Sequence, residues 1–162
     1  IVSRLVSYKR VDLAIEVFNQ LSWPLKIIGD GREKKRLKKI ARGNIEFLGE
    51  LTDGELLGYY QKSRAVIFPH EEDFGLVPLE AQASGRPVIA FRKGGALETV
   101  VEGETGLFFD PQTSGALAKV LKQLGKVAFK PKAYQEHLVK FNQVRFKKEF
   151  KKRVEKAWTR NQ

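Results

Sequence analysis

The chain has 162 residues, a formal net charge of +11 and a hydrophobic content of 42%. This length is typical of one globular domain, and the hydrophobic content excludes a disordered chain. The absence of cysteine excludes disulfides and thiolate chemistry, and two distant histidines, His70 and His137, argue against a histidine metal site. No apolar run reaches the ~20 residues that cross a bilayer. These features favour a cytoplasmic protein.

Basic residues are concentrated in two runs, at residues 32–39 and 146–153. Both runs are expected to be solvated helix faces. The alternatives are attraction to an anionic membrane surface or to phosphorylated ligands. Nucleic acid is not expected as a partner, because the sequence shows no base-stacking motif and no helix-turn-helix pattern.

The predicted elements alternate between strands and helices. The strands are short apolar runs rich in β-branched residues, and the helices carry apolar residues at helical spacing. Thr52 and Glu55 predict a capping box, and Pro78 and Gly85 mark the start and end of one helix. In chain order the elements are strand 1–6, helix 10–21, strand 24–29, helix 31–42, strand 44–49, a helix after Thr52, strand 65–68, helix 76–84, strand 87–91 and helix 112–124.

This alternation predicts an α/β fold, a Rossmann-like parallel sheet flanked by helices and joined by right-handed crossovers. Such sheets bind ligands outside the carboxyl ends of their strands, so the loops that follow the strands are the candidate sites. These loops are residues 7–10, 29–32, 49–53, 69–75 and 92–95.

The last segment differs from the rest of the chain. Phe146, Phe150, Val154 and Trp158 lie four residues apart and predict an apolar stripe along a basic helix. Such a helix usually packs against its own protein. An uncovered stripe would instead suit a second copy of the chain or an anionic bilayer, which would place the protein at the membrane periphery. We therefore divide the chain into a Rossmann-like domain, 1–140, and an amphipathic basic helix, 141–162.

The acidic loop HEEDFG is the most informative of the strand-end loops. Gly75 lets a ligand approach the backbone, and the N-terminus of the following helix suits a phosphate. Glu72 and Glu80 can accept hydrogen bonds from hydroxyl groups. Arg4 and Lys9, at the same edge of the predicted sheet, supply the positive charge that a diphosphate needs, although alone they are equally consistent with ordinary surface charges. Phosphate beside many hydroxyl groups describes a nucleotide sugar.

Seven residues separate Glu72 from Glu80, within EDFGLVPLEAQASGRPVIA. Together with SRLVSYKRVDLAIEVF, IGDG and NIEFLGEL in the same order, this stretch resembles the retaining glycosyltransferases of family 4, which have the GT-B fold. The resemblance covers residues 1–125. It implies that this chain is the C-terminal, donor-binding half of a two-domain enzyme. The N-terminal, acceptor-binding domain is expected to lie outside this sequence, and the chain alone is not expected to transfer sugar.

The resemblance also implies catalytic roles. Arg4 and Lys9 would hold the diphosphate and stabilise it as the leaving group, and Glu72 would bind hydroxyls of the donor sugar. Gly94 and Gly95 would shape the cleft, or simply form a turn. No metal and no cofactor are expected, because the cationic side chains and the helix N-terminus would supply the charge. Retention of configuration would follow from same-face attack, with the leaving phosphate helping to take the acceptor's proton.

Further residues are implied in binding the donor. The backbone N–H groups of Phe74, Gly75 and Leu76 would contact sugar and phosphate. Glu80 would bind the ribose, and the backbone near Leu51 would meet the base. Two departures from the family pattern stand nearby: a histidine at position 70, where a small residue is usual, and a glutamine at position 82, where an apolar residue is commoner.

Two other functions are compatible with parts of this pattern. The chain could be a non-catalytic nucleotide-sugar-binding or partner-interaction module, which the intact Arg4, Lys9, Glu72 and Glu80 argue against. An NAD-type dinucleotide-binding domain is disfavoured, because SYKR follows the first strand where a G-x-G-x-x-G motif is required. The stretches SRLVSYKRVDLAIE and EEDFGLVPLEAQASGRPVIA most resemble mannosyltransferases. This resemblance favours GDP-mannose as the donor, with UDP-sugars as the alternative.

Overall fold

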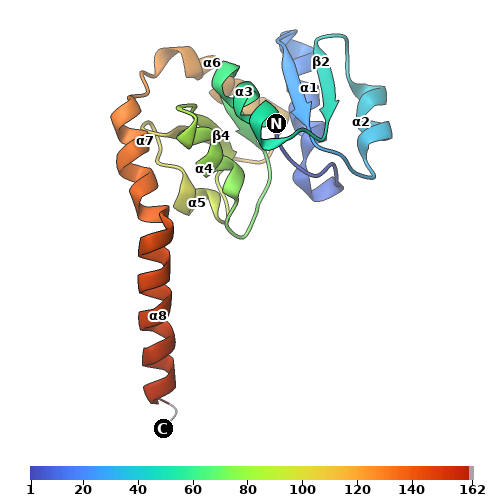
Figure 1. Cartoon of the computed structure of the whole chain (residues 1–162). Helices are drawn as coiled ribbons and strands as arrows, with labels where there is room; N and C mark the ends of the chain where they lie inside the picture. The colour runs from blue at the N-terminus through green and yellow to red at the C-terminus, as the bar shows by residue number, and fades with distance from the viewer. Residues whose placement is uncertain (161–162) are drawn as a thin grey trace.

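The structure is a computed structural model that describes residues 1–160, and its strands form two parallel sheets (Figure 1). In the first sheet Ile27 pairs with Phe47, and in the second Ile67 pairs with Ile89. The parallel pairing confirms the predicted fold class. The first sheet consists of β1 (Leu25–Ile28) and β2 (Ile45–Gly49), and the second has the order β3 (Val66–Phe68), β4 (Val88–Phe91) and β5 (Gly106–Phe109).

Helices connect the strands, and further helices form the C-terminal part of the chain. The predicted capping box is confirmed at the start of α3, where the Thr52 hydroxyl accepts from the Glu55 N–H and the Glu55 carboxylate accepts from the Thr52 N–H. The helices are α1 (Val11–Leu21), α2 (Lys34–Ile40), α3 (Asp53–Lys62), α4 (Leu76–Ala83), α5 (Ala96–Thr99), α6 (Ser114–Gln123), α7 (Pro131–Leu138) and α8 (Gln143–Arg160), with 3-10 turns η1 (Ser7–Lys9), η2 (Leu124–Lys126) and η3 (Val139–Phe141).

The prediction of a regular strand at residues 1–6 is wrong. This segment is extended beside β1 but forms a single isolated bridge, between Val2 and Ile28. The Ile28 N–H donates to the Ile1 carbonyl at 2.8 Å, and the Ser3 N–H donates to the Ile28 carbonyl at 3.0 Å. The expected single sheet is likewise divided in two, because the described residues place no strand between β1 and β3.

Three elements, β5, α5 and α7, lie in segments to which the sequence analysis gave no structure. Each is short, with four residues in β5 and in α5 and eight in α7. Such segments carry too few residues to show a periodicity. β5 is defined instead by its neighbour, since Leu107 pairs with Ile89 of β4.

The second sheet is buried on both faces, because consecutive side chains of a strand point to opposite sides. Ile67 and Ile89 belong to one apolar cluster, which also contains the buried side chains of α1 and α6. Phe68 and Ala90 belong to a second cluster, with Ala81 of α4. Full burial of such a side chain stabilises the fold by about 1.5–3 kcal/mol, so the strand ends that carry the loops are firmly held.

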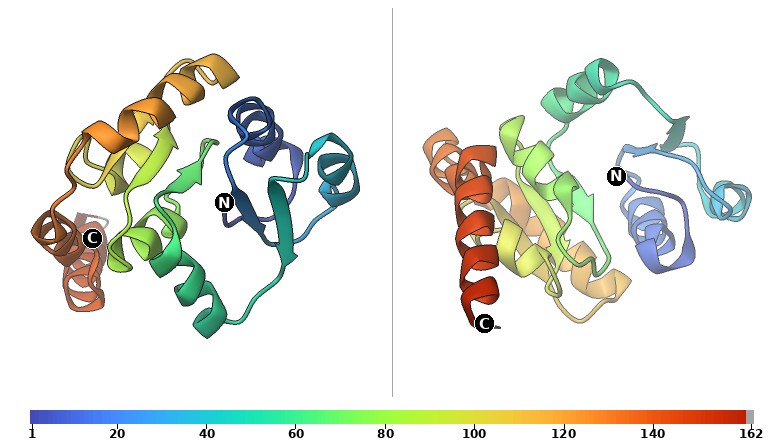
Figure 2. Two further views of the ribbon diagram at one scale, coloured as in Figure 1. Left: turned by 90° about the horizontal axis from the view of Figure 1, so that it is seen from above. Right: turned by 60° about the horizontal axis from the view of Figure 1, so that its bottom comes forward.

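The C-terminal helix α8 extends away from the rest of the chain (Figure 1). In the two views of Figure 2 it lies with α7 on the side of the second sheet that is remote from β1, β2, α1 and α2. The stripe residues Phe146, Phe150, Val154 and Trp158 are 65%, 58%, 50% and 70% exposed. The expectation that this stripe packs against its own protein is therefore wrong for the helix as described. Residues 161–162 of the predicted helix lie outside the described residues.

Candidate functional site

Three loops meet at one place on the surface. They follow the extended residues 1–6, strand β3 and strand β4. A side-chain contact between Lys9 and Glu72 joins the first loop to the second. A backbone hydrogen bond of 2.7 Å from the Gly95 N–H to the Glu72 carbonyl joins the second to the third. The structure thus brings together residues that are far apart in the sequence, as the sheet-edge argument predicts.

Lys9 lies at the centre of this site. Its ammonium group forms an ion pair with the Glu72 carboxylate and donates to Nε2 of His70 at 3.1 Å. It also lies 4.9 Å from the centre of the Tyr8 ring. Only 11% of the Lys9 side chain is exposed, and this burial, followed by the charge of Arg4, lowers the pKa of Lys9. The ammonium is therefore a partly desolvated charge, whose electrostatic effect on a ligand is stronger than in water.

His70 completes the surroundings of Lys9, a role that the sequence did not reveal. Its ring is 1% exposed and lies 4.1 Å from the ring of Phe68. Burial, and then the charge of Lys9, lowers the pKa of His70 to about 3. The ring is therefore neutral at physiological pH, and its Nε2 lone pair can accept the hydrogen bond from Lys9. The signal in the sequence was the departure from the family pattern at this position.

The loop that carries Glu72 is held by close glycine contacts. Gly94 has φ +60°, and a Cβ atom there would lie 2.5 Å from the Glu72 carbonyl oxygen. A Cβ atom on Gly95 would lie 2.3 Å from the backbone of Phe74. Both glycines are therefore required for the loop after β4 to pack against the loop after β3. The Glu72 side chain remains 29% exposed, which leaves it accessible to a ligand.

Gly75 is the N-cap residue of α4, with φ +82°. A Cβ atom there would meet the Phe68 ring at 2.9 Å, so the position requires glycine. The helix begins at Leu76, whose side chain is 64% exposed, and Phe74 before it is 37% exposed. The first-turn N–H groups have no partner within the helix, and the positive end of its dipole favours an anion.

Glu80 lies on α4, and a residue of another helix, α3, holds its side chain in place. The Tyr60 hydroxyl, on α3, donates to Oε2 of Glu80 at 2.8 Å. Burial is the main reason that the pKa of Tyr60 is raised, and the hydrogen bond and charge of Glu80 add to it. The tyrosine thus remains a phenol donor that orients the carboxylate, while Glu80 itself is exposed. This hydrogen bond joins two helices, α3 and α4, and local sequence patterns do not reveal it.

Arg4 is exposed and lines a small cavity of about 300 Å³. Arg32 and Gly31 line the same cavity, so two arginines border it. The sequence analysis had assigned Arg32 to a solvated helix face. Leu51 is half-buried in the loop between β2 and α3, and no hydrogen bond among the described residues joins it to Lys9 or Glu72.

Residues 1–160 contain no cluster of three His, Asp or Glu side chains arranged to hold a metal ion. The positive charge at the site comes from the side chains of Arg4, Lys9 and Arg32 and from the N-terminus of α4. In the same described part of the chain, none of the helices combines the length and the apolar character needed to cross a membrane.

Comparison with known proteins shows which family the chain resembles. A glycosyltransferase of Methanocaldococcus jannaschii, described as uncharacterized, is 31% identical over 128 residues, which are 76% of this chain and 36% of that protein. The alpha-1,3/1,6-mannosyltransferase alg-2 of Neurospora crassa is 52% identical over 59 residues, which are 36% of this chain and 12% of that protein. The chain thus spans about a third or less of the length of these two curated relatives.

The fold is also found in solved structures. The crystal structure of HepE from Anabaena in complex with UDP matches with a TM-score of 0.81 at 25% identity, over 95% of this chain and 47% of that chain. This similarity agrees with the predicted GT-B half, a Rossmann-like domain of parallel strands and helices. The family described as glycosyl transferases group 1 matches residues 1–138, and the chain belongs to this family.

Proposed function

We propose that this chain is the donor-binding domain of a retaining, metal-independent glycosyltransferase that uses a nucleoside-diphosphate sugar. The observation that carries the proposal is the contact of Lys9 with Glu72 beside the N-terminus of α4. A cation for phosphate and a carboxylate for hydroxyl groups are thereby held together at one point. Since the chain spans less than half of the relatives described above, transfer to an acceptor is proposed for a longer protein that includes it.

The diphosphate would bind between the cationic side chains and α4. Arg4 and Lys9 would hold it by their charges, and the N–H groups that follow Gly75 would donate hydrogen bonds to it. A hydrogen bond to a charged group contributes about 1.5–3 kcal/mol. Negative charge develops on the leaving phosphate as the sugar–phosphate bond breaks, so these fixed positive groups stabilise the transition state more than the ground state.

The carboxylates would bind the hydroxyl groups of the donor. Glu72 would accept from the sugar and Glu80, oriented by Tyr60, would accept from the ribose. Glu72 is already paired with Lys9, which lowers its nucleophilicity and suits a positioning role. Retention would then proceed by attack of the acceptor from the face that the phosphate leaves, and a phosphate oxygen would take the acceptor's proton.

UDP-sugars are the first donors to test. The sequence alone favoured GDP-mannose, and the similarity to alg-2 over 59 residues agrees with a mannosyl donor. The HepE structure, which matches far more of the chain, contains UDP. The backbone near Leu51, at the start of α3, would contact the base and thereby choose between the two nucleotides.

Calorimetry in EDTA tests the proposed site. UDP or GDP should bind the chain in the absence of any divalent metal, and NAD should not. In the same titration, Glu80→Ala should weaken both the nucleotide and the sugar nucleotide, with a loss of about 1.5–3 kcal/mol, because every such ligand contains the ribose. Tyr60→Phe is the matched control for orientation and should cause a smaller loss of the same kind.

Glu72→Ala should instead weaken the sugar nucleotide and spare the bare diphosphate, which lacks the sugar. Binding only with magnesium would refute the metal-independent site. Equal losses for both ligands in both carboxylate variants would refute the assignment of Glu72 to the sugar and Glu80 to the ribose.

His70 provides a test through pH. Its pKa is lowered to about 3 in the fold, whereas a free histidine titrates near ~6.5. The unfolded chain therefore binds the proton first as the pH falls, so this residue makes stability decline between about pH 6.5 and 3. The NMR signals of the His70 ring should not titrate above about pH 5.

His70→Phe should flatten the stability profile in that window and weaken UDP binding, because Lys9 loses the acceptor that positions it. His137→Phe is the control: the pKa of His137 is also lowered, mainly by burial, but its Nε2 contacts the Thr99 carbonyl rather than Lys9. It should leave UDP affinity unchanged. A His70 ring that titrates near ~6.5 contradicts the buried, neutral acceptor.

We further propose that α8 contacts an anionic membrane surface. The exposed stripe and the basic residues of this helix, among them Lys147, Lys148, Lys151 and Lys152, match the pattern of interfacial helices. Vesicles of phosphatidylserine should pellet the chain, and vesicles of phosphatidylcholine should not. Phe150→Ser, which keeps the charge, should reduce pelleting. Equal recovery in the supernatant with both lipids would exclude this role.

A further inference from the structure

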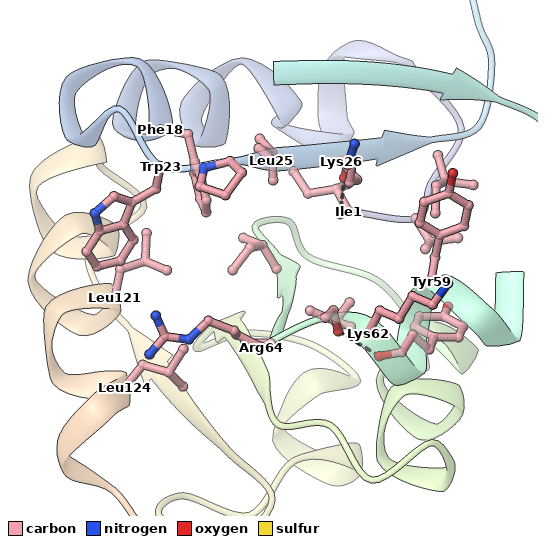
Figure 3. A pocket seen from close by; sticks show the side chains of 18 of the residues that line it. Ile1, Phe18, Trp23, Leu25, Lys26, Tyr59, Lys62, Arg64, Leu121 and Leu124 are labelled. Atoms are coloured by element: carbon pink, nitrogen blue, oxygen red, sulfur yellow. Dashed lines mark hydrogen bonds between the residues drawn. The ribbon is translucent and has the colours of Figure 1, made fainter. Parts of the chain in front are cut away.

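The two halves of the candidate site belong to different sheets. Lys9 follows the extended residues 1–6 beside β1, whereas Glu72 follows β3. Among the described residues no strand pairing joins these two sheets, and an apolar cavity of about 680 Å³ lies between β1 and β3 (Figure 3). The position of Lys9 relative to Glu72 therefore depends on contacts that lie outside the sheets.

Gln112 makes one such contact, although it belongs to neither half of the site. It is half-buried and lies between β5 and α6. Its side-chain oxygen Oε1 accepts a hydrogen bond of 3.1 Å from Nη1 of Arg10, the residue after Lys9. Its side-chain nitrogen Nε2 donates to the carbonyl of Pro69, the residue before His70, at 2.8 Å. One side chain thus joins the two segments that carry the site.

An amide side chain suits both ends of this bridge. The Arg10 guanidinium offers only donors, whereas the Pro69 carbonyl only accepts, so the group between them must accept on one side and donate on the other. These two partners also fix the orientation of the Gln112 amide, because the reverse orientation would oppose like groups at both ends. Pro69 is buried, where a carbonyl without a partner would lower stability.

Arg10 has a backbone conformation that is unusual for a residue with a side chain. Its φ is +49°, in the left-handed region that favours glycine. The Arg10 N–H donates to the Ser7 carbonyl at 3.1 Å, and the Arg10 carbonyl accepts from the Leu13 N–H at 3.2 Å, so this conformation connects η1 to α1. Strained residues of this kind cluster at functional sites. The contact with Gln112 gives a reason for an arginine at this position.

The segment that carries Gln112 is itself held against α1. The Ser114 hydroxyl donates to Oε1 of Glu16, on α1, at 2.9 Å. Leu117 of α6 and Ile15 of α1 are fully buried in the same apolar cluster. Gln112 is therefore attached to a rigid support and can hold the two loops in place.

We propose that Gln112 is a positioning residue for donor binding. Through Arg10 and Pro69 it holds the segment of Lys9 and the loop after β3 at the separation that lets one diphosphate reach both Lys9 and the N-terminus of α4. A separation that is fixed before binding lowers the cost of ordering the site around the ligand. This inference rests on the proposed function, because it concerns the same donor site.

Four variants of the 162-residue chain test the bridge. Gln112→Met keeps an unbranched side chain of similar length but removes both hydrogen bonds. Arg10→Asn keeps a residue that tolerates the left-handed conformation but is too short to reach Gln112. The third variant combines both changes. Gln123→Met, at an exposed position at the end of α6, is the matched control.

Three measurements are needed. Calorimetry gives the affinity for UDP, and thermal unfolding gives the melting temperature. Hydrogen exchange of the Lys9 amide, which donates to the Val6 carbonyl at 3.1 Å, reports local opening of this segment, with the core amide of Ile89 as the reference.

Gln112→Met and Arg10→Asn should each weaken UDP binding about three- to tenfold, and the double variant should lose no more than Gln112→Met alone. Arg10→Asn should melt within about 2 °C of the parent chain, because the relieved backbone offsets the lost contact. In Gln112→Met the Lys9 amide should exchange at least about fivefold faster relative to Ile89. Gln123→Met should match the parent chain in all three measurements.

UDP affinity that is unchanged in Gln112→Met would overturn the proposal. Losses that multiply in the double variant would overturn it as well, because Arg10 and Gln112 would then act separately. Arg10→Asn tests the same bridge from its other end if Gln112→Met does not fold. If the parent chain binds no nucleoside diphosphate, the proposed function itself fails. The Lys9 amide then decides the bridge: faster exchange in Gln112→Met supports it, and equal exchange refutes it.

Discussion

The site depends on one partly buried ammonium group. Lys9 is held between a carboxylate and a neutral imidazole, and each partner constrains it differently. Glu72 balances its charge, whereas His70 accepts a hydrogen bond without competing for a proton. A fully solvated lysine would be free to move and would attract an anion weakly. Here folding has already removed most of the water around the ammonium group, so a diphosphate would meet a charge that is already in position.

The rest of the site holds these groups in fixed positions relative to one another. Gly94 and Gly95 allow the loop after β4 to approach the backbone of Glu72 and Phe74, and Gly75 lies against the Phe68 ring, where a Cβ atom would not fit. Tyr60 orients Glu80 from a separate helix. Because strands β3 and β4 are buried on both faces, the loops at their ends rest on rigid supports, and the site needs little reorganisation on binding.

The sequence predicted the elements with strong local signals and the residues with family-like spacing. Strands β1 to β4, the capping box at Thr52 and the proximity of Lys9 to Glu72 follow from such signals. The structural roles of His70, Tyr60 and Arg32 could not be predicted in this way, because each depends on a partner distant in the sequence or on the shape of a cavity. The division into two sheets was equally hidden, since pairing between strands is not encoded in the periodicity of either one.

The central claim is that Arg4, Lys9 and the N-terminus of α4 form one diphosphate site. A crystal structure of the chain with UDP tests it most directly. The account predicts phosphate oxygens within hydrogen-bond distance of the Lys9 ammonium and of the first N–H groups after Gly75, with the ribose against Glu80. A diphosphate bound elsewhere, with the contact between Lys9 and Glu72 unchanged and the N-terminus of α4 free, would contradict it.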